Sequence, residues 1–79
     1  MKITATDILT SLRSEAGEPE IAGDAEQLLD TSLDDLGYDS LAVIGTATAL
    51  RTKFGKVIED KDLVEAHTLR DLVDLANAS

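Results

Sequence analysis

The sequence predicts an all-α fold, a small four-helix bundle of three main helices and one short helix, with a long loop between the first and second helices. Its 79 residues suffice for one domain over 1–79, and a chain of this size buries only about 60–65% of its unfolded surface. The apolar residues are mostly 12 Leu, 10 Ala, 5 Ile and 4 Val, which favours helices over sheet. They recur at helical spacing in three separate segments.

The first helix is predicted over residues 5–16. Thr4 or Thr6 can cap its N-terminus, because a hydroxyl there accepts a hydrogen bond from a free backbone N–H. Gly17, as a left-handed cap, and Pro19, as a helix breaker, are expected to end it. The apolar residues at helical spacing are Ile8, Leu9, Leu12 and Ala16.

Residues 17–39 form a long connection that contains the only Pro and three of the five Gly. An unstructured connection of this length is unusual in a compact domain, so we expect apolar side chains to hold it in place. We expect a helical turn near 25–29 and a second turn over 32–36, closed by Gly37. The apolar side chains concerned are Ile21, Leu28, Leu29, Leu33 and Leu36.

The clearest helix is predicted over residues 40–54, with Asp39 or Ser40 as its cap and Gly55 as its end. Apolar residues spaced i, i+4, i+7 and i+11 are typical of one buried helix face. The residues of this stripe are Val43, Ala47, Leu50 and Phe54.

A second stripe lies on another face of the same helix. A domain this small cannot easily bury both stripes, so the second is a candidate surface for a partner protein. Gly45 costs the helix roughly 1 kcal/mol relative to Ala, which indicates tolerance or the close approach of another group. The residues of the second stripe are Leu41, Ile44, Thr48 and Arg51.

Two further helices are predicted after this one. A short helix is expected near 60–65, and the last helix is expected over 69–77 with Thr68 as its cap. The expected inner-face residues of the last helix are Leu69, Leu72, Val73 and Ala76, with Leu75 in addition.

The charged residues are distributed unevenly. The chain has 16 acidic and 7 basic residues, a net charge of −9. Residues 1–39 carry a net −8, residues 40–58 a net +3 with no acid, and residues 59–79 a net −4. An acid-free stretch between two acidic flanks can arise by chance in so short a chain, or it can mark a contact surface with its own electrostatic requirements.

The composition excludes several classes of protein. The net charge disfavours binding to nucleic acid or to anionic membranes, because both require clustered Lys and Arg. No run approaches the roughly 18 apolar residues of a membrane span, and no secretory leader begins the sequence. We therefore expect a cytoplasmic protein. With no cysteine, the chain has no thiol of its own.

Catalytic and metal-binding interpretations have weak support. Ser40, His67 and a carboxylate could nominally form a catalytic triad, but the Gly-x-Ser-x-Gly turn and the strand before it are missing. His67 is expected at the surface. The acidic residues within 30–39 and 60–65 do not match the calcium-binding loop, so we expect a solvated acidic surface and no metal site.

Ser40 stands at the N-terminus of the clearest helix, directly after Asp39. A hydroxyl there is exposed enough to be modified. A phosphate attached to it would meet free N–H groups and the helix dipole, worth about 0.3–1 kcal/mol. Ser is also among the commonest helix caps, so the local pattern alone leaves a capping role and a modification site open.

The run Leu36-Gly37-Tyr38-Asp39-Ser40-Leu41, opening an amphipathic helix, resembles the phosphopantetheine attachment site of acyl carrier proteins. The similarity extends through essentially the whole chain, including Val57-Ile58 and Thr68-Leu69-Arg70-Asp71-Leu72. It implies a single acyl-carrier domain over 1–79 and a non-catalytic carrier. In this family a phosphopantetheinyl transferase moves 4′-phosphopantetheine from coenzyme A to the serine, here Ser40, and the arm carries acyl groups as thioesters. A chain without cysteine would thereby gain a thiol.

The resemblance also assigns recognition residues. Asp39 and Leu41 would help the transferase and partner enzymes to recognise Ser40. The face presented to partner enzymes would consist of Ile44, Gly45, Thr48 and Arg51.

The acid-free second helix indicates the branch of the family. Fatty-acid carriers usually present acidic residues there, whereas this chain has Gly45 and Arg51 where Glu is common. The runs Gly-Tyr-Asp-Ser-Leu-Ala and Thr-x-Arg-Asp-Leu are more similar to the discrete carriers of type II polyketide synthases, especially aromatic ones. This implies the transferase, a ketosynthase with its chain-length factor, a malonyl-acyltransferase and a ketoreductase or cyclase as partners, and a monomer. The flanking acids expected to contribute to docking are Asp34, Asp35, Asp39, Asp60 and Glu65.

Other interpretations stay open at this point. The protein could be a fatty-acid synthase carrier, or a small acidic interaction module in which Ser40 is only a cap; a hydrolase is the weakest alternative. Small residues in the core, at Ala47, Ala66 and Ala76, suggest that the bundle opens between the second and last helices to shelter an acyl chain near Leu50, Leu72 and Val73. We expect a free-standing chain, although an excised domain of a larger synthase would look the same.

Overall fold

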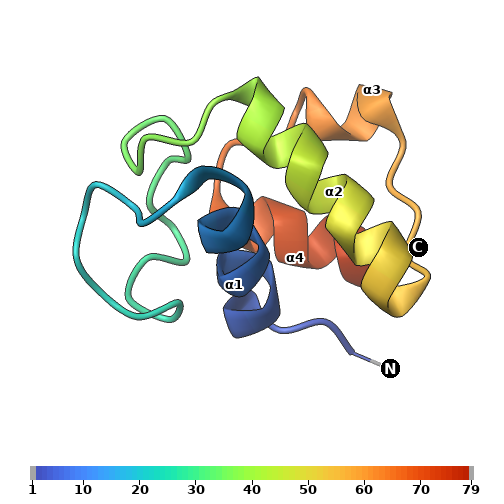
Figure 1. The fold of residues 1–79 in the computed structure, drawn as a ribbon, viewed down its shortest axis with the longest axis horizontal. Helices are drawn as coiled ribbons and strands as arrows, with labels where there is room; N and C mark the ends of the chain where they lie inside the picture. Colours follow the sequence, from blue (N-terminus) through green and yellow to red (C-terminus); the bar gives the residue numbers. More distant parts are fainter. Residues whose placement is uncertain (1, 79) are drawn as a thin grey trace.

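The computed structural model describes residues 2–78, and this part of the chain is all-helical (Figure 1). The predicted bounds of the first two helices are confirmed. The third helix is shorter than predicted, because residues 64 and 65 form a turn, and the fourth extends one residue further than predicted. The helices are α1 (Ala5–Ala16), α2 (Ser40–Phe54), α3 (Asp60–Leu63) and α4 (Leu69–Ala78).

The N-terminus of α1 is closed by a reciprocal pair of hydrogen bonds. The backbone N–H of Asp7 donates to Thr4 Oγ1 at 3.1 Å, and the N–H of Thr4 donates to Asp7 Oδ2 at 2.9 Å. Thr4 is therefore the cap, and the pair satisfies two otherwise free N–H groups. Gly17 ends the helix with φ 88° and ψ −174°, a positive φ but not the left-handed helical conformation that we expected.

The same type of cap begins α4. The N–H of Asp71 donates to Thr68 Oγ1, and the N–H of Thr68 donates to Asp71 Oδ2, both at 3.2 Å. Thr68 is thus the cap that the sequence predicts. At the C-terminus of α2, Gly55 adopts the left-handed conformation (φ 68°, ψ 18°), and its N–H donates to the carbonyl of Arg51.

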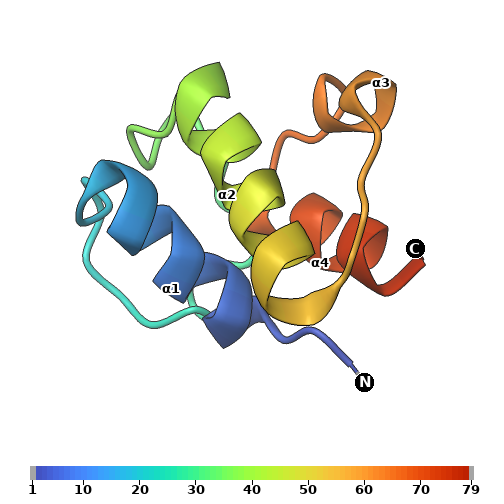
Figure 2. The ribbon, with the colours of Figure 1, turned by 45° about the vertical axis from the view of Figure 1, so that its right-hand side comes forward.

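The core lies among α1, α2 and α4. Helix α1 packs against both α2 and α4, and α3 contacts α2 (Figure 2). The predicted stripe of α2 faces inward, with Val43 and Leu50 buried and Ala47 and Phe54 partly buried. On α4, Leu69, Leu72 and Ala76 are buried and Val73 is partly buried.

The long loop is held against the start of α4. The N–H of Leu33 donates to the carbonyl of His67 at 2.8 Å, and the N–H of Arg70 donates to the carbonyl of Leu29 at 2.9 Å. The Arg70 guanidinium also binds both carboxylate oxygens of Asp30, at 2.6 and 3.0 Å, which holds the pKa of Asp30 below its ordinary value. These contacts fix residues 29–33 beside α4.

The two predicted turns of the loop are present, at 25–30 and 33–37. Gly37 closes the second turn with φ 86°. Leu28, Leu33 and Leu36 are buried as predicted, and Leu29 is partly buried. The prediction for Ile21 is wrong, because its side chain is 41% exposed.

A hydrogen bond of Tyr38 connects the end of α1 to the segment that precedes α2. Its side chain is buried, and its hydroxyl donates a hydrogen bond to the carbonyl of Gly17 at 3.0 Å. Burial raises the pKa of Tyr38, while the nearby Arg13 lowers it to a lesser extent. Tyr38 lies two residues before Ser40, so the same contact restricts where α2 begins.

We expect the phenol of Tyr38 to titrate above its ordinary pKa of about 10. The folded state favours the neutral phenol. The stabilisation that Tyr38 contributes is therefore fully present below the pKa of tyrosine in the unfolded chain. It is lost as the pH rises through the raised pKa of Tyr38 in the folded protein. Tyr38 is the only tyrosine and the chain has no tryptophan, so tyrosinate absorbance reports this group alone.

The matched variant for this titration is Tyr38→Phe. The quantity to compare is the difference in melting temperature between wild type and variant from pH 8 to 11, because any pH dependence common to both proteins cancels in that difference. The difference should narrow as the pH rises. A titration midpoint at or below 10 in the folded protein would contradict the burial argument.

Among residues 2–78, no helix combines the length and the apolar composition that a membrane crossing requires.

Candidate functional site

Ser40 is the first residue of α2, and its side chain is exposed. The cap of the helix is Asp39, whose Oδ1 accepts a hydrogen bond from the N–H of Ala42 at 3.0 Å. The Ser40 side chain makes no hydrogen bond within residues 2–78. Of the two roles that the sequence left open, capping belongs to Asp39, and the hydroxyl of Ser40 is left available for chemistry.

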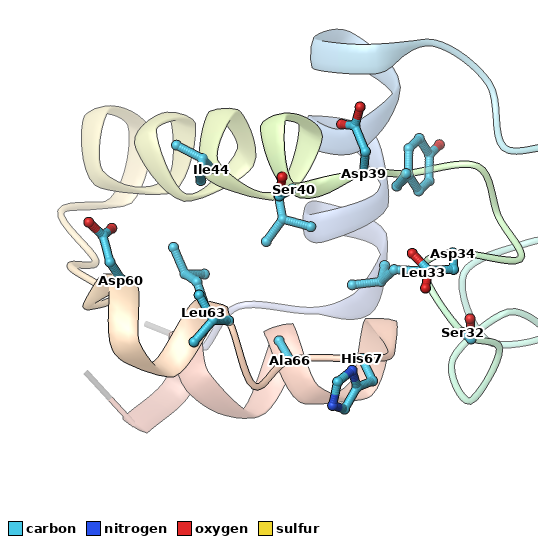
Figure 3. Close-up of a pocket in the computed structure, with 13 residues that line it drawn as sticks. Ser32, Leu33, Asp34, Asp39, Ser40, Ile44, Asp60, Leu63, Ala66 and His67 are labelled. Atoms are coloured by element: carbon cyan, nitrogen blue, oxygen red, sulfur yellow. The ribbon is translucent and has the colours of Figure 1, made fainter.

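A pocket of about 410 Å³ lies beside Ser40, between α2, α3 and the long loop (Figure 3). Its size is at the lower end of the range for small-molecule sites, and three separate segments of the chain form its walls. The loop contributes Ser32, Leu33, Asp34 and Tyr38; the start of α2 contributes Asp39, Ser40, Val43 and Ile44; and the α3 region contributes Asp60, Leu63, Val64, Ala66 and His67.

The pocket combines an apolar interior with charged groups at its edge. Leu33 and Leu63 are almost fully buried, whereas Asp34 and Asp60 are exposed. Such a pocket suits a slender, largely uncharged chain attached at its mouth. The exposed residue Ser40 is part of the lining of this pocket.

The shelter predicted between α2 and α4 is not where the structure has its pocket. Leu50 and Leu72 are 0% and 1% exposed, and neither they nor Val73 line the pocket beside Ser40. Leu50 and Leu72 belong to the buried core, whereas the pocket lies between α2, α3 and the long loop. Of the small residues, Ala76 is fully buried, and Ala47 and Ala66 are partly buried.

The second stripe of α2 is exposed over its whole length. Leu41 is 76% exposed and Ile44 is 49% exposed, and Thr48 and Arg51 are also exposed. A large apolar side chain as open as Leu41, directly after Ser40, is the kind of group that a partner covers. The role of this stripe in docking stays a prediction.

Gly45 is placed differently from the other residues of the predicted partner face. A side-chain carbon added there would lie 2.7 Å from Oε2 of Glu15 on α1. The close approach that the sequence suggested is therefore made by a side chain of the same protein. Gly45 lies toward α1, whereas Ile44, Thr48 and Arg51 lie on the side of α2 that faces residues 57–63.

The sequence indicated Asp60 in this region but not the apolar side chains that α3 and the residue after it contribute to the site. Leu63 and Val64 line the pocket, and Val64 is 77% exposed. A helix of four residues is too short to show a periodic pattern, so spacing could not assign these side chains. The signal that could have found them is the pair of adjacent apolar residues within an otherwise charged segment.

The structure offers no support for catalysis or metal binding. Ser40 and His67 line the same pocket, and His67 is exposed as predicted, but no hydrogen bond joins their side chains. Among residues 2–78, Ser40 therefore has no hydrogen-bonded base of the kind that activates a nucleophile. Within the described chain, no three His, Asp or Glu side chains are grouped so that they could hold a metal ion.

The family model for the phosphopantetheine attachment site matches residues 7–76 of this chain. The oxytetracycline polyketide synthase acyl carrier protein of Streptomyces rimosus is 40% identical over 80 residues, which cover 98% of this chain and 81% of that protein. This chain belongs to the acyl carrier protein family. The carrier is also 35% identical over 77 residues to the actinorhodin polyketide synthase acyl carrier protein of Streptomyces coelicolor, covering 98% of this chain and 90% of the relative.

The fold of the carrier matches solved structures of such proteins. The malonyl form of the actinorhodin carrier from Streptomyces coelicolor superposes with a TM-score of 0.83 at 35% identity, covering all of this chain and 92% of that one. The holo form of the same actinorhodin carrier superposes with a TM-score of 0.79 at 36% identity, covering 99% of this chain and 91% of that one. The predicted fold class and family are confirmed. The protein is a non-catalytic carrier of the kind that holds a covalently attached 4′-phosphopantetheine.

Proposed function

We propose that Ser40 is the residue of this carrier that bears the phosphopantetheine arm. The observation that supports the proposal is the exposed Ser40 hydroxyl at the mouth of the pocket, released from capping because Asp39 caps α2. In the loading reaction, a bond forms between Ser40 Oγ and the phosphorus next to the pantetheine of coenzyme A. The bond to the nucleotide phosphate breaks, adenosine 3′,5′-bisphosphate leaves, and the hydroxyl proton passes to a base of the transferase.

The residues around Ser40 fit an attached phosphodiester. Helix geometry leaves the N–H groups of Ser40 and Leu41 without partners inside the helix, whereas the N–H of Ala42 donates a hydrogen bond to the Asp39 side chain. These free donors and the positive end of the α2 dipole favour a negative group at this position. When bound, the arm supplies the thiol that carries acyl groups, which this chain lacks because it has no cysteine.

The pocket residues position and protect what Ser40 holds. Leu33, Val43 and Leu63 offer an apolar wall that excludes water from part of an acyl chain. The exposed acids Asp34 and Asp60 at the edge keep the mouth hydrated. The unloaded chain is thus ready to bear an arm at its surface and to shelter part of the cargo reversibly.

The cargo that we propose is a polyketide intermediate, delivered to the enzymes of a type II polyketide synthase. The support is the identity with the oxytetracycline and actinorhodin carriers, together with an α2 that contains no acidic residue. The proposed partners are a phosphopantetheinyl transferase, a ketosynthase with its chain-length factor, a malonyl-acyltransferase and a ketoreductase or cyclase. The proposed location is the cytoplasm, where coenzyme A is supplied, and the proposed state is a monomer.

One measurement tests the attachment. The apo protein is incubated with coenzyme A and a broad-specificity phosphopantetheinyl transferase, and its intact mass is followed. We expect a gain of one phosphopantetheine, and fragmentation of the modified peptide should place it on Ser40. No gain with a transferase that loads a known carrier in the same mixture would favour the interaction module without a prosthetic group.

A further inference from the structure

An exposed apolar strip runs from Ser40 along α2, and we call it the docking strip. It consists of Leu41, Ile44, Val57 and Val64, which are 76%, 49%, 58% and 77% exposed. Beneath it, the pocket beside Ser40 and a smaller hollow of about 130 Å³ share Ile44, Asp60 and Leu63 as lining residues. The two hollows therefore lie next to each other along the side of α2 that faces α3.

The two ends of the docking strip carry opposite charge. At the Ser40 end stand the exposed carboxylates of Asp34, Asp35 and Asp39. At the other end Arg51 lines the smaller hollow, about 16 Å from Ser40 along the helix axis at 1.5 Å per residue. Residues 40–58 contain no acid. Asp60 lines the same hollow, but among residues 2–78 it forms no ion pair with Arg51.

Arg51 differs from the other arginines of this chain. Arg13 pairs with Glu18 at 2.9 Å and Arg70 pairs with Asp30 at 2.6 Å. In the part of the chain that the structure describes, Arg51 has neither an ion pair nor a side-chain hydrogen bond. An exposed, uncommitted guanidinium at the rim of an apolar depression is suited to a carboxylate of another protein, which it can bind through two parallel hydrogen bonds.

We propose that the partner enzyme presents a carboxylate to Arg51, an apolar surface to Leu41, Ile44 and Val64, and basic residues to the acids around Ser40. The inference rests on the proposed attachment at Ser40. The proposed docking differs from recognition through an acidic second helix, because Arg51 at the far end of α2 attracts a carboxylate of the partner enzyme. Arg51 would thus fix the direction in which α2 lies on the partner and distinguish this synthase from one with a uniformly basic docking surface.

The test compares three variants of the holo protein, each loaded on Ser40 with a malonyl group. The readout is kcat/KM for decarboxylative condensation by the ketosynthase and chain-length factor of the actinorhodin polyketide synthase. Arg51→Glu should lower kcat/KM about tenfold at low salt, with a much smaller effect at 0.5 M salt, because exposed charges are screened. Arg51→Lys should retain part of the rate, because lysine keeps the positive charge but loses the second hydrogen bond to the carboxylate.

The matched control is Lys53→Glu. Lys53 lies on the same helix and is exposed, and its replacement by Glu changes the net charge by the same amount as Arg51→Glu. Lys53 is two residues after Arg51, which corresponds to a turn of about 200° around the helix axis and places Lys53 away from the docking strip. It should change kcat/KM less than twofold.

Three results would overturn the inference. The first is an equal effect of Arg51→Glu and Lys53→Glu, which would indicate net charge alone. The second is an unchanged or higher rate for Arg51→Glu, and the third is no turnover of the wild-type protein, because the docking strip would then not fit this enzyme in the proposed direction. Each of these results would leave the proposed attachment standing if the mass gain on Ser40 is observed.

Discussion

Ser40→Ala is expected to accept no phosphopantetheine while unfolding at the same temperature as the wild type. The substitution removes the one hydroxyl that the proposed transfer needs. It should leave α2 intact, because the side chain that caps the helix is that of Asp39, with Oδ1 3.0 Å from the N–H of Ala42. Alanine is also a strong helix former. Intact mass after incubation with coenzyme A and transferase, and a thermal melt of the same sample, measure the two properties.

Asp39→Ala is the matched variant for the neighbouring position. It removes the cap, so we expect a loss of about 1 kcal/mol in the free energy of unfolding and a melting temperature lower by roughly 4–8 °C. The Ser40 hydroxyl is still present, so loading should continue, although more slowly if the transferase recognises Asp39. A Ser40→Ala protein that melts well below the wild type, or that still gains mass, would refute the division of roles between these residues.

Leu50→Ala is expected to lower the free energy of unfolding by about 2–5 kcal/mol. Leu50 is 0% exposed on the inner face of α2, so truncation leaves a cavity in the core. The total free energy of unfolding for a domain of this size is about 4–12 kcal/mol, so this one change removes a large fraction of it. Chemical denaturation followed by circular dichroism measures the effect.

The control for Leu50→Ala is the same deletion on the same helix at Leu41. That side chain is 76% exposed, so Leu41→Ala should change the free energy of unfolding by less than about 0.5 kcal/mol. If the two variants lost similar stability, the assignment of one apolar stripe of α2 to the core and the other to the surface would be wrong.

Local signals in the sequence predicted most of the helix bounds. Helix α1 begins after Thr4 and ends before Gly17, and α2 ends before Gly55, because capping and termination depend on residues within a few positions. The inward stripe of α2 was also predictable, because helical spacing is a local pattern of the sequence. Short α3 was predicted too long, since a four-residue helix has no repeat from which to read its end.

The contacts that place the loop could not be predicted in this way. The hydrogen bond from Leu33 to His67 and the ion pair between Asp30 and Arg70 join residues 34 and 40 positions apart. Nothing in the local pattern pairs such residues. Small core residues suggested that the bundle opens between α2 and α4, whereas the pocket beside Ser40 is lined by the loop, the start of α2 and the α3 region. Ser40 itself was singled out by sequence, and its attachment role stays a prediction until the mass is measured.

The two ends of the described chain are held together by side-chain hydrogen bonds. The N–H of Ile3 donates to Asn77 Oδ1 at 2.8 Å, and Asn77 Nδ2 donates to the carbonyl of Ile3 at 2.9 Å. This junction lies away from the start of α2, where Ser40 stands (Figure 1). A polypeptide of only a few residues could join the ends, so the carrier could be circularised or inserted into a surface loop of another protein with its modifiable serine still facing outward.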